Sequence, residues 1–71
     1  MKLKIGDVVL IKYYPNCNEI KGRVGKVTGY GGRSPYVVRL FGSPIDGYSD
    51  FVFDYEDLEK LSEDEALPYL I

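Results

Sequence analysis

Residues 5–11 read Ile-Gly-Asp-Val-Val-Leu-Ile and residues 21–27 read Lys-Gly-Arg-Val-Gly-Lys-Val, and these two stretches decide the fold of the 71-residue chain. In the first, Gly6-Asp7 precedes an aliphatic run. This order is typical of a turn that leads into a strand, because Asp hydrogen-bonds nearby backbone and Gly adopts positive φ. In the second, Gly25 lies inside an apolar strand and indicates a bulge or a close approach of neighbouring backbone. The two stretches predict the opening of a small, bent β-barrel.

Five strands are predicted from runs of β-branched, aliphatic and aromatic residues separated by turn residues. They cover Val8–Tyr13, Val24–Tyr30, Tyr36–Phe41, Tyr48–Phe53 and Glu59–Leu61. The first strand is apolar on both faces, as expected of a strand shared by two orthogonal sheets of a small barrel. In the fourth strand Phe51 and Phe53 recur at period two, so one face of that strand enters the core.

The acidic end of the chain predicts short helical structure. Residues 54–58 are expected to form one helical turn with Asp54 as its N-cap, because acidic residues favour the first turn of a helix. Residues 62–65 have the capping-box form Ser-x-x-Glu, and Pro68 is expected to stop any helix there. One continuous helix over residues 55–67 is the alternative. The domain is therefore predicted to comprise a barrel over residues 1–61 and an acidic, then apolar tail over residues 62–71, which either packs on the barrel or is an exposed docking tail.

Length and composition restrict the class of protein. The chain has room for one domain, and its 45% hydrophobic and 28% charged residues indicate a folded rather than a disordered chain. No apolar run approaches the roughly 18 residues of a membrane span, and Met1–Ile5 does not resemble a signal peptide, so we expect a cytoplasmic protein without membrane insertion. The single cysteine, Cys17, excludes an intramolecular disulfide and is interpreted as an incidental loop residue.

Charge is divided unevenly along the chain. Up to Arg39 there are eight basic and two acidic residues, a net charge of +6, whereas the remainder has one basic and nine acidic residues, a net charge of −8. Two interpretations stay open. Either a basic face opposes an acidic one and steers a charged partner, or the two halves interleave and largely neutralise each other.

The residue types argue against catalysis. The chain has no histidine, so neither a Ser-His nor a Cys-His nucleophile is present. The spacing of the carboxylates is not that of a calcium loop, and no cysteine-histidine cluster offers a zinc site. The carboxylates at 54–59 are interpreted as a solvated acidic turn rather than an acid-base pair. We therefore expect a protein that is not an enzyme, with no cofactor, no metal and no catalytic residues.

The order Gly-Asp-x-Val-x-Ile, then Gly-x-x-Gly-x-Val, then an apolar third strand resembles the SH3-like barrels of the KOW type over roughly residues 5–61. Within that group the chain is most similar to the family of photosystem I reaction-centre subunit IV. The shared residues are Gly6, Asp7, Gly25, Val27, Val38, Arg39, Leu40, Phe53 and Leu58. The resemblance implies an all-β fold, a small SH3-like five-stranded barrel, to which the residue pattern adds a short helical turn and, as a possibility, a short C-terminal helix. It also implies that Arg39 docks a ferredoxin.

The remaining prediction is a binding role. Seven Tyr and three Phe supply rings that suit interfaces, and several of the Tyr lie in or beside loops. We expect a non-catalytic module that binds a larger protein or ribonucleoprotein stoichiometrically, as an adaptor or inhibitor. The predicted partner-binding residues are aromatic and basic: Tyr14, Lys21, Arg23, Lys26, Tyr30, Arg33, Tyr36 and Arg39.

Three alternatives remain from the sequence. The first is RNA, DNA or ribosome binding in the manner of KOW domains, with Lys21, Arg23, Lys26 and Arg33 on phosphates and Tyr30 stacking on bases, although a pI near 4.9 argues against it. The second is the ferredoxin docking implied by the family resemblance. The third is homodimerisation through an open sheet edge.

Overall fold

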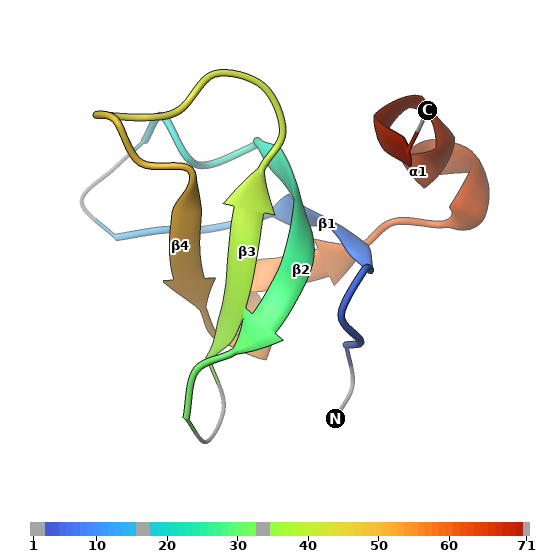
Figure 1. The fold of residues 1–71 in the computed structure, drawn as a ribbon, viewed down its shortest axis with the longest axis horizontal. Coiled ribbons are helices and arrows are strands. Elements are labelled where there is room, and N and C mark those ends of the chain that lie inside the picture. Colours follow the sequence, from blue (N-terminus) through green and yellow to red (C-terminus); the bar gives the residue numbers. More distant parts are fainter. Residues whose placement is uncertain (1–2, 16–17, 33–34, 71) are drawn as a thin grey trace.

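The computed structural model describes residues 3–15, 18–32 and 35–70 as a small, mostly β fold (Figure 1). Its elements are β1 (Val8–Ile11), β2 (Val24–Tyr30), β3 (Tyr36–Leu40), β4 (Asp50–Phe53), the 3-10 helix η1 (Tyr55–Asp57), β5 (Leu58–Lys60) and α1 (Glu63–Leu70). The five predicted strands and the helical turn between the last two are confirmed. The predicted location of Cys17 in the first loop lies outside the described residues.

All five strands form one antiparallel sheet in the order β4-β3-β2-β1-β5. The two strands at the edges are β4 and β5, and within the described residues no ladder joins them. The sheet is therefore not closed by hydrogen bonds. The basic first half of the chain supplies the three central strands, whereas the acidic second half supplies both edges. The strand order therefore places strands of the acidic half on both sides of the basic half.

Strand ends differ from the predicted ones by one or two residues, because loop hydrogen bonds replace the ladder there. β1 ends at Ile11, since the next amide, that of Lys12, donates to the carbonyl of Asp57 at 2.8 Å. β4 begins at Asp50 rather than at Tyr48, because Tyr48 belongs to a separate two-residue hairpin with Ile45. The turn residues of that hairpin have φ values of 51° and 82°, as a type I′ turn requires.

The hydrophobic core lies on one face of the bent sheet and is closed by the loops. Its buried residues are Leu3, Val9, Ile11, Ile20, Val27, Tyr36, Val38, Leu40, Ile45, Phe53 and Leu58. Every strand contributes to this list, so the core joins segments far apart in sequence. Val8 is also buried but lies outside this cluster, and its register partner is the exposed Lys26. Both faces of β1 are thus covered, as its apolar pattern predicted.

Of the two features predicted at Gly25, a bulge or a close approach of neighbouring backbone, the structure shows the second. At Gly25 a Cβ atom would lie 2.5 Å from Cγ1 of Val38 and 2.8 Å from the carbonyl oxygen of Arg39, which confirms the close approach of β3. The bulge occurs instead three residues later, where the register with β3 shifts between Val27 and Gly29. Steric exclusion between strands, rather than an extra residue, therefore requires glycine at position 25.

The Gly-Asp turn before β1 forms as predicted. Gly6 has a φ of 101°, and Asp7 accepts a hydrogen bond from the amide of Lys4 at 2.9 Å through Oδ2. The amide of Asp7 in turn donates to the carbonyl of Lys4 at 3.0 Å. The same carboxylate lies 3.8 Å from Nζ of Lys60 on β5. The turn is therefore fixed by its own side chain and leads directly into β1.

The C-terminal helix confirms one prediction and contradicts two. The capping box forms, since Ser62 Oγ accepts from the amide of Glu65 at 3.3 Å and the amide of Ser62 donates to Glu65 Oε1 at 3.1 Å. The expectation that Pro68 stops the helix is wrong, because α1 continues to Leu70. In so short a helix proline removes only the bond to the carbonyl of Asp64, and that residue is exposed to water.

The alternative of one continuous helix over residues 55–67 is also wrong, because β5 separates η1 from α1. Tyr69 stacks on Phe41 with ring centroids 5.3 Å apart, so the helix packs on the rest of the molecule through this ring. In Figure 1, α1 stands to one side of the sheet, on the side away from β4. Over the described residues no helix is long and apolar enough to cross a membrane.

Candidate functional site

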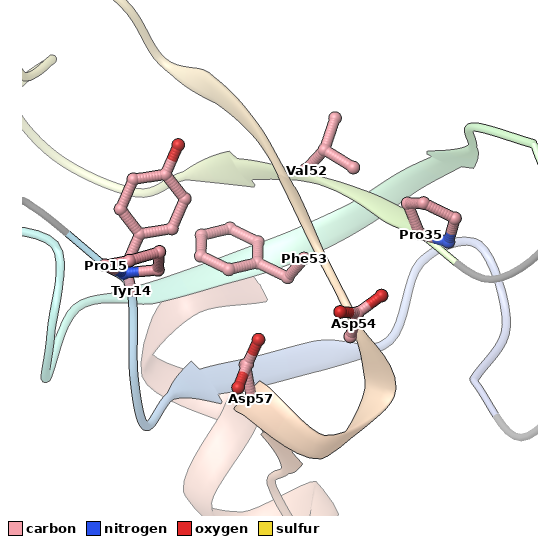
Figure 2. A pocket seen from close by; sticks show the side chains of 7 residues that line it. All are labelled: Tyr14, Pro15, Pro35, Val52, Phe53, Asp54 and Asp57. Atoms are coloured by element: carbon pink, nitrogen blue, oxygen red, sulfur yellow. The ribbon is translucent and has the colours of Figure 1, made fainter.

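A pocket of about 420 Å³ opens where three segments come together: the first loop, Pro35 before β3, and the stretch from the end of β4 to η1 (Figure 2). Its lining combines aromatic, proline, aliphatic and acidic residues: Tyr14, Pro15, Pro35, Val52, Phe53, Asp54 and Asp57. These residues come from three parts of the chain that are distant in sequence. The pocket is therefore a product of the fold rather than of any single motif.

Backbone hydrogen bonds fix the position of the acidic wall against the first loop. The amide of Lys12 donates to the carbonyl of Asp57 at 2.8 Å, which holds the start of the loop beside η1. The amide of Asp57 donates to the carbonyl of Asp54 at 3.1 Å and closes the 3-10 turn. Next to this turn, Leu58 pairs with Ile11 in the ladder between β5 and β1. Both carboxylates are thus carried by backbone that the sheet itself holds in place.

Aromatic packing fixes the apolar floor of the pocket. The ring of Tyr14 makes edge contacts with Phe53 and Phe51, at centroid distances of 5.2 Å and 5.9 Å. Phe53 is only 3% exposed, and in the view of Figure 2 its ring lies between that of Tyr14 and the two aspartates. The pocket therefore has a rigid apolar floor supported by the core. Side chains fixed in this way lose little conformational freedom when a partner binds.

The two carboxylates of the pocket are available to a ligand. Asp54 is exposed and Asp57 is half-buried. Asp54 precedes η1 but makes no side-chain capping hydrogen bond. Within residues 3–15, 18–32 and 35–70, neither carboxylate has a hydrogen-bonding or ion-pairing partner. Among the described residues, two negative charges thus lie beside an apolar floor without an ion-pairing partner.

Three of the predicted contact residues have structural roles. Arg23 is half-buried, and its Nη2 donates to the carbonyls of Phe41 and Ser43 at 2.8 Å and 2.7 Å. The hydroxyl of Tyr30 donates to the carbonyl of Leu3 at 2.9 Å. Tyr36 is a core residue with an exposed fraction of 4%. Arg23 and Tyr30 therefore connect segments of the fold, and Tyr36 packs inside it.

The remaining predicted residues that the structure describes do not form one site. Tyr14 lies in the pocket, and Lys21 is exposed in the first loop. Lys26 is exposed on β2 and is paired in register with Arg39 on β3. Arg33 lies outside the described residues. The structure thus brings Lys26 and Arg39 together on the outer sheet face, and it places Tyr14 in a separate site.

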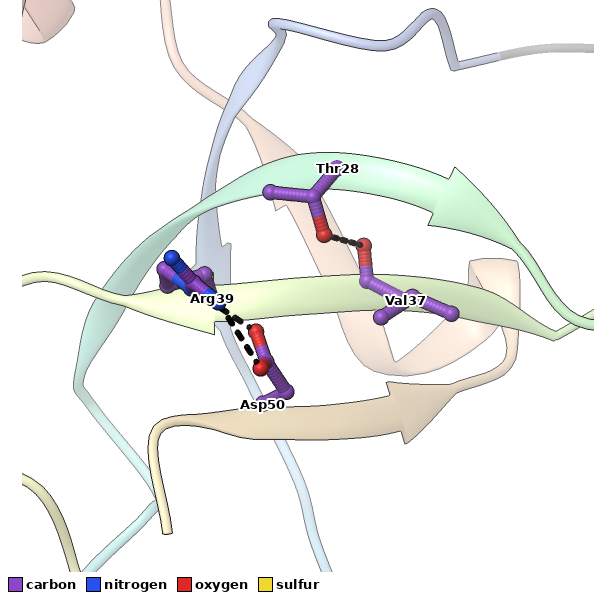
Figure 3. Close-up of polar contacts among 4 residues, drawn as sticks. All are labelled: Thr28, Val37, Arg39 and Asp50. Carbon is purple, nitrogen blue, oxygen red and sulfur yellow. Dashed lines mark hydrogen bonds and ion pairs between the residues drawn. The ribbon is translucent and has the colours of Figure 1, made fainter.

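Arg39 is already engaged by a carboxylate. Figure 3 shows its Nε and Nη2 donating to Oδ1 and Oδ2 of Asp50 on β4, at 3.0 Å and 3.1 Å. These hydrogen bonds lower the pKa of Asp50 and raise that of Arg39 from their ordinary values. In the same view the hydroxyl of Thr28, at the bulge, donates to the carbonyl of Val37 at 3.4 Å. An acidic partner docking on Arg39 would have to compete with Asp50.

The sequence indicated the members of the pocket without indicating their assembly. The prolines and Tyr14 were visible as loop residues, and the carboxylates of η1 as a solvated acidic turn. Two ladders bring these segments together: β1 with β5 places the first loop beside η1, and β3 with β4 places Pro35 beside the end of β4. Over the described residues no group of three or more histidine, cysteine or acidic residues is placed to hold a metal ion.

Comparison with models of protein families, with curated proteins and with solved structures found no significant match to this chain. The geometry of the site is therefore the basis for its functional interpretation.

Proposed function

We propose that this chain is a non-catalytic binding module that binds a larger protein or ribonucleoprotein stoichiometrically, with the pocket as a central contact. The observation that carries the proposal is the lining of the pocket, which joins a fixed aromatic and aliphatic floor to two carboxylates that have no partner among the described residues. Concave apolar surfaces with a few placed polar groups are the usual form of a binding site. Aromatic anchors near the centre of such a site supply most of its binding free energy.

We propose further that the scaffold is an SH3-like barrel of the KOW type. Two features support this assignment: β1 pairs with both β2 and β5, which joins the first and last strands of the sequence, and η1 separates β4 from β5. The assignment concerns the scaffold alone, because one fold of this kind serves many functions. The function is therefore argued from the pocket.

The observations favour a protein surface over bare nucleic acid as the partner. Among the residues expected on phosphates and bases, Arg23 is held by two backbone carbonyls and the Tyr30 hydroxyl by a third. The half of the chain after Arg39, which has a net charge of −8, supplies both edges of the sheet, and phosphate binding requires the opposite charge.

Partner capture with a blocked pocket tests the proposal. Val52 lines the pocket and is 51% exposed, so Val52→Trp places a large ring at its wall without entering the core. Ile5 is 62% exposed and does not line the pocket, so Ile5→Trp is the matched control. Tagged full-length chains are mixed with extract of the native host, and the partner is identified by mass spectrometry.

We expect the original chain and Ile5→Trp to recover the same partner, and Val52→Trp to recover it at least about tenfold less well, a loss of about 1.4 kcal/mol. The complex of purified proteins, measured by size-exclusion chromatography with light scattering, should have a fixed stoichiometry. Equal recovery by a folded Val52→Trp protein, or no recovery above background by the original chain, would contradict the proposal.

A further inference from the structure

We propose that the pocket receives an arginine side chain of the partner protein, with its guanidinium between the carboxylates of Asp54 and Asp57. This inference rests on the proposed binding function and specifies the chemistry of the partner. Its basis is the juxtaposition of two carboxylates, unpaired within the described part of the chain, with aromatic and proline surface in one opening.

Charge selects a cation. Both carboxylates face the same opening, and over the described residues none of the basic side chains forms an ion pair with either one. The two ion pairs found there lie elsewhere, at Arg39 with Asp50 and at Lys60 with Asp7. A cation entering from solvent therefore meets two negative charges and displaces no partner that belongs to residues 3–15, 18–32 or 35–70. Half-burial of Asp57 reduces the screening of that attraction by water.

The apolar surface selects arginine over lysine. A guanidinium is planar and weakly hydrated, so it stacks on an aromatic face while its edge donates to carboxylates. Tyr14 and Phe53 provide rings that line the same pocket as Asp54 and Asp57, and the Phe53 ring lies nearer to the two aspartates in Figure 2. Pro15 and Pro35 add apolar surface for the methylene stem of the side chain. An ammonium is compact and strongly hydrated, and it gains less from such walls.

The size of the pocket agrees with one side chain and its flanking backbone. Sites for small molecules span about 300 to 1,000 Å³, and the volume of about 420 Å³ lies in the lower part of that range. An exposed loop of the partner that presents one arginine therefore fits the pocket better than a larger folded surface does.

The carboxylates can be removed without loss of known internal contacts. Asp54→Asn is nearly isosteric, and Asp54 makes no capping hydrogen bond through its side chain. The hydrogen bonds that fix η1 use backbone atoms of Asp54 and Asp57, which the double variant Asp54→Asn/Asp57→Asn retains. The matched control is Asp46→Asn/Asp64→Asn, which changes the net charge equally and lies outside the pocket.

The probe is a capped Gly-Gly-Arg-Gly-Gly peptide, compared with the same peptide carrying lysine or the neutral isostere citrulline. Binding to the full-length protein is followed by ¹H–¹⁵N NMR titration up to about 10 mM peptide, because one anchoring residue is expected to bind in the millimolar range. We expect shifts centred on Tyr14, Val52 and Asp57, and weaker binding at higher salt. Citrulline should reduce affinity about three- to tenfold and lysine by less.

The same reduction is expected when the arginine peptide meets Asp54→Asn/Asp57→Asn, while Asp46→Asn/Asp64→Asn should bind as the original chain does. Equal binding of arginine and citrulline, no shift up to the highest peptide concentration, or full binding by the folded Asp54→Asn/Asp57→Asn protein would overturn the inference. Partner capture separates the two proposals. If Val52→Trp loses the partner and Asp54→Asn/Asp57→Asn keeps it, the binding module stands and the arginine site fails.

Discussion

The sheet and α1 are both held by apolar contacts, yet they depend on contacts of different kinds. The core beneath the sheet joins residues from every strand and from the loops, including Leu3 near one end of the chain and Leu58 near the other. α1 has a single buried residue, Ala66, together with the stack of Tyr69 on Phe41 and its own capping box. Leu67 and Leu70, by contrast, remain at least half exposed.

This difference predicts two levels of stability in one small domain. Contacts among distant segments are lost together, so the sheet should unfold as one cooperative unit. A helix of eight residues is marginal in water by itself, because its nucleation is costly. α1 should therefore open locally at a smaller free energy than the sheet. The pocket lies on the sheet side of this division, since all of its residues precede α1.

The largest expected effect is that of Gly25→Ala on the sheet. The new methyl group would meet Cγ1 of Val38 and the backbone carbonyl of Arg39, and the backbone cannot move aside without disturbing the ladder. We expect a loss of about 2 to 4 kcal/mol in the free energy of unfolding, most of the stability of so small a domain. Urea denaturation followed by circular dichroism measures it.

Gly29→Ala in the same strand is the control. A Cβ atom at position 29 meets nothing within 4 Å, and its φ is not positive. We expect a change of less than about 1 kcal/mol, because alanine there mainly restricts the unfolded chain. Similar urea midpoints for the two variants would show that the approach of β3 to Gly25 does not limit the packing of the sheet.

An intermediate effect, confined to α1, is expected of Ser62→Ala. The change removes the hydroxyl that accepts from the amide of Glu65, and loss of such a cap costs about 1 kcal/mol. Amide hydrogen exchange should accelerate across Glu63–Leu70 while the exchange of β1, β2 and β3 stays the same. An equal acceleration in the strands would show that the helix and the sheet form one cooperative unit.

Much of the fold follows from local signals in the sequence, and the rest depends on packing between distant segments. β-branched runs predicted the strands, and the Gly-Asp turn and the capping box were predicted to the residue, since each depends on hydrogen bonds within four positions. The prediction that Pro68 stops the helix was wrong, because the effect of a proline depends on how many helical hydrogen bonds remain around it. The pocket was not predicted, since its walls meet only through the pairing of β1 with β5 and of β3 with β4. Arg23 was expected at a surface, whereas its hydrogen bonds to the loop at 41–43 arise from the fold.

The smallest expected effect is a pH dependence that separates the same two regions. Hydrogen bonds from Ser62 lower the pKa of Glu65 in α1, and hydrogen bonds from Arg39 lower the pKa of Asp50 in β4. A carboxylate with a lowered folded-state pKa stabilises the fold above its ordinary pKa, and this contribution disappears as the pH falls through the lowered value. Both contributions should therefore be complete at neutral pH and be lost in the acidic range below the ordinary pKa values of Glu and Asp.

The variants Glu65→Gln and Asp50→Asn test whether the contribution of Glu65 to stability is confined to α1 and that of Asp50 to the sheet. Glu65→Gln should flatten the acid-induced rise in hydrogen exchange of α1 and leave the strands as they were. Asp50→Asn should flatten the acid dependence of the urea midpoint of the sheet and leave the helix unaffected. Both side chains are exposed, so each effect should be small and should shrink further at high salt. A Glu65→Gln effect on the strands as large as that on α1 would mean that the helix opens only with the sheet.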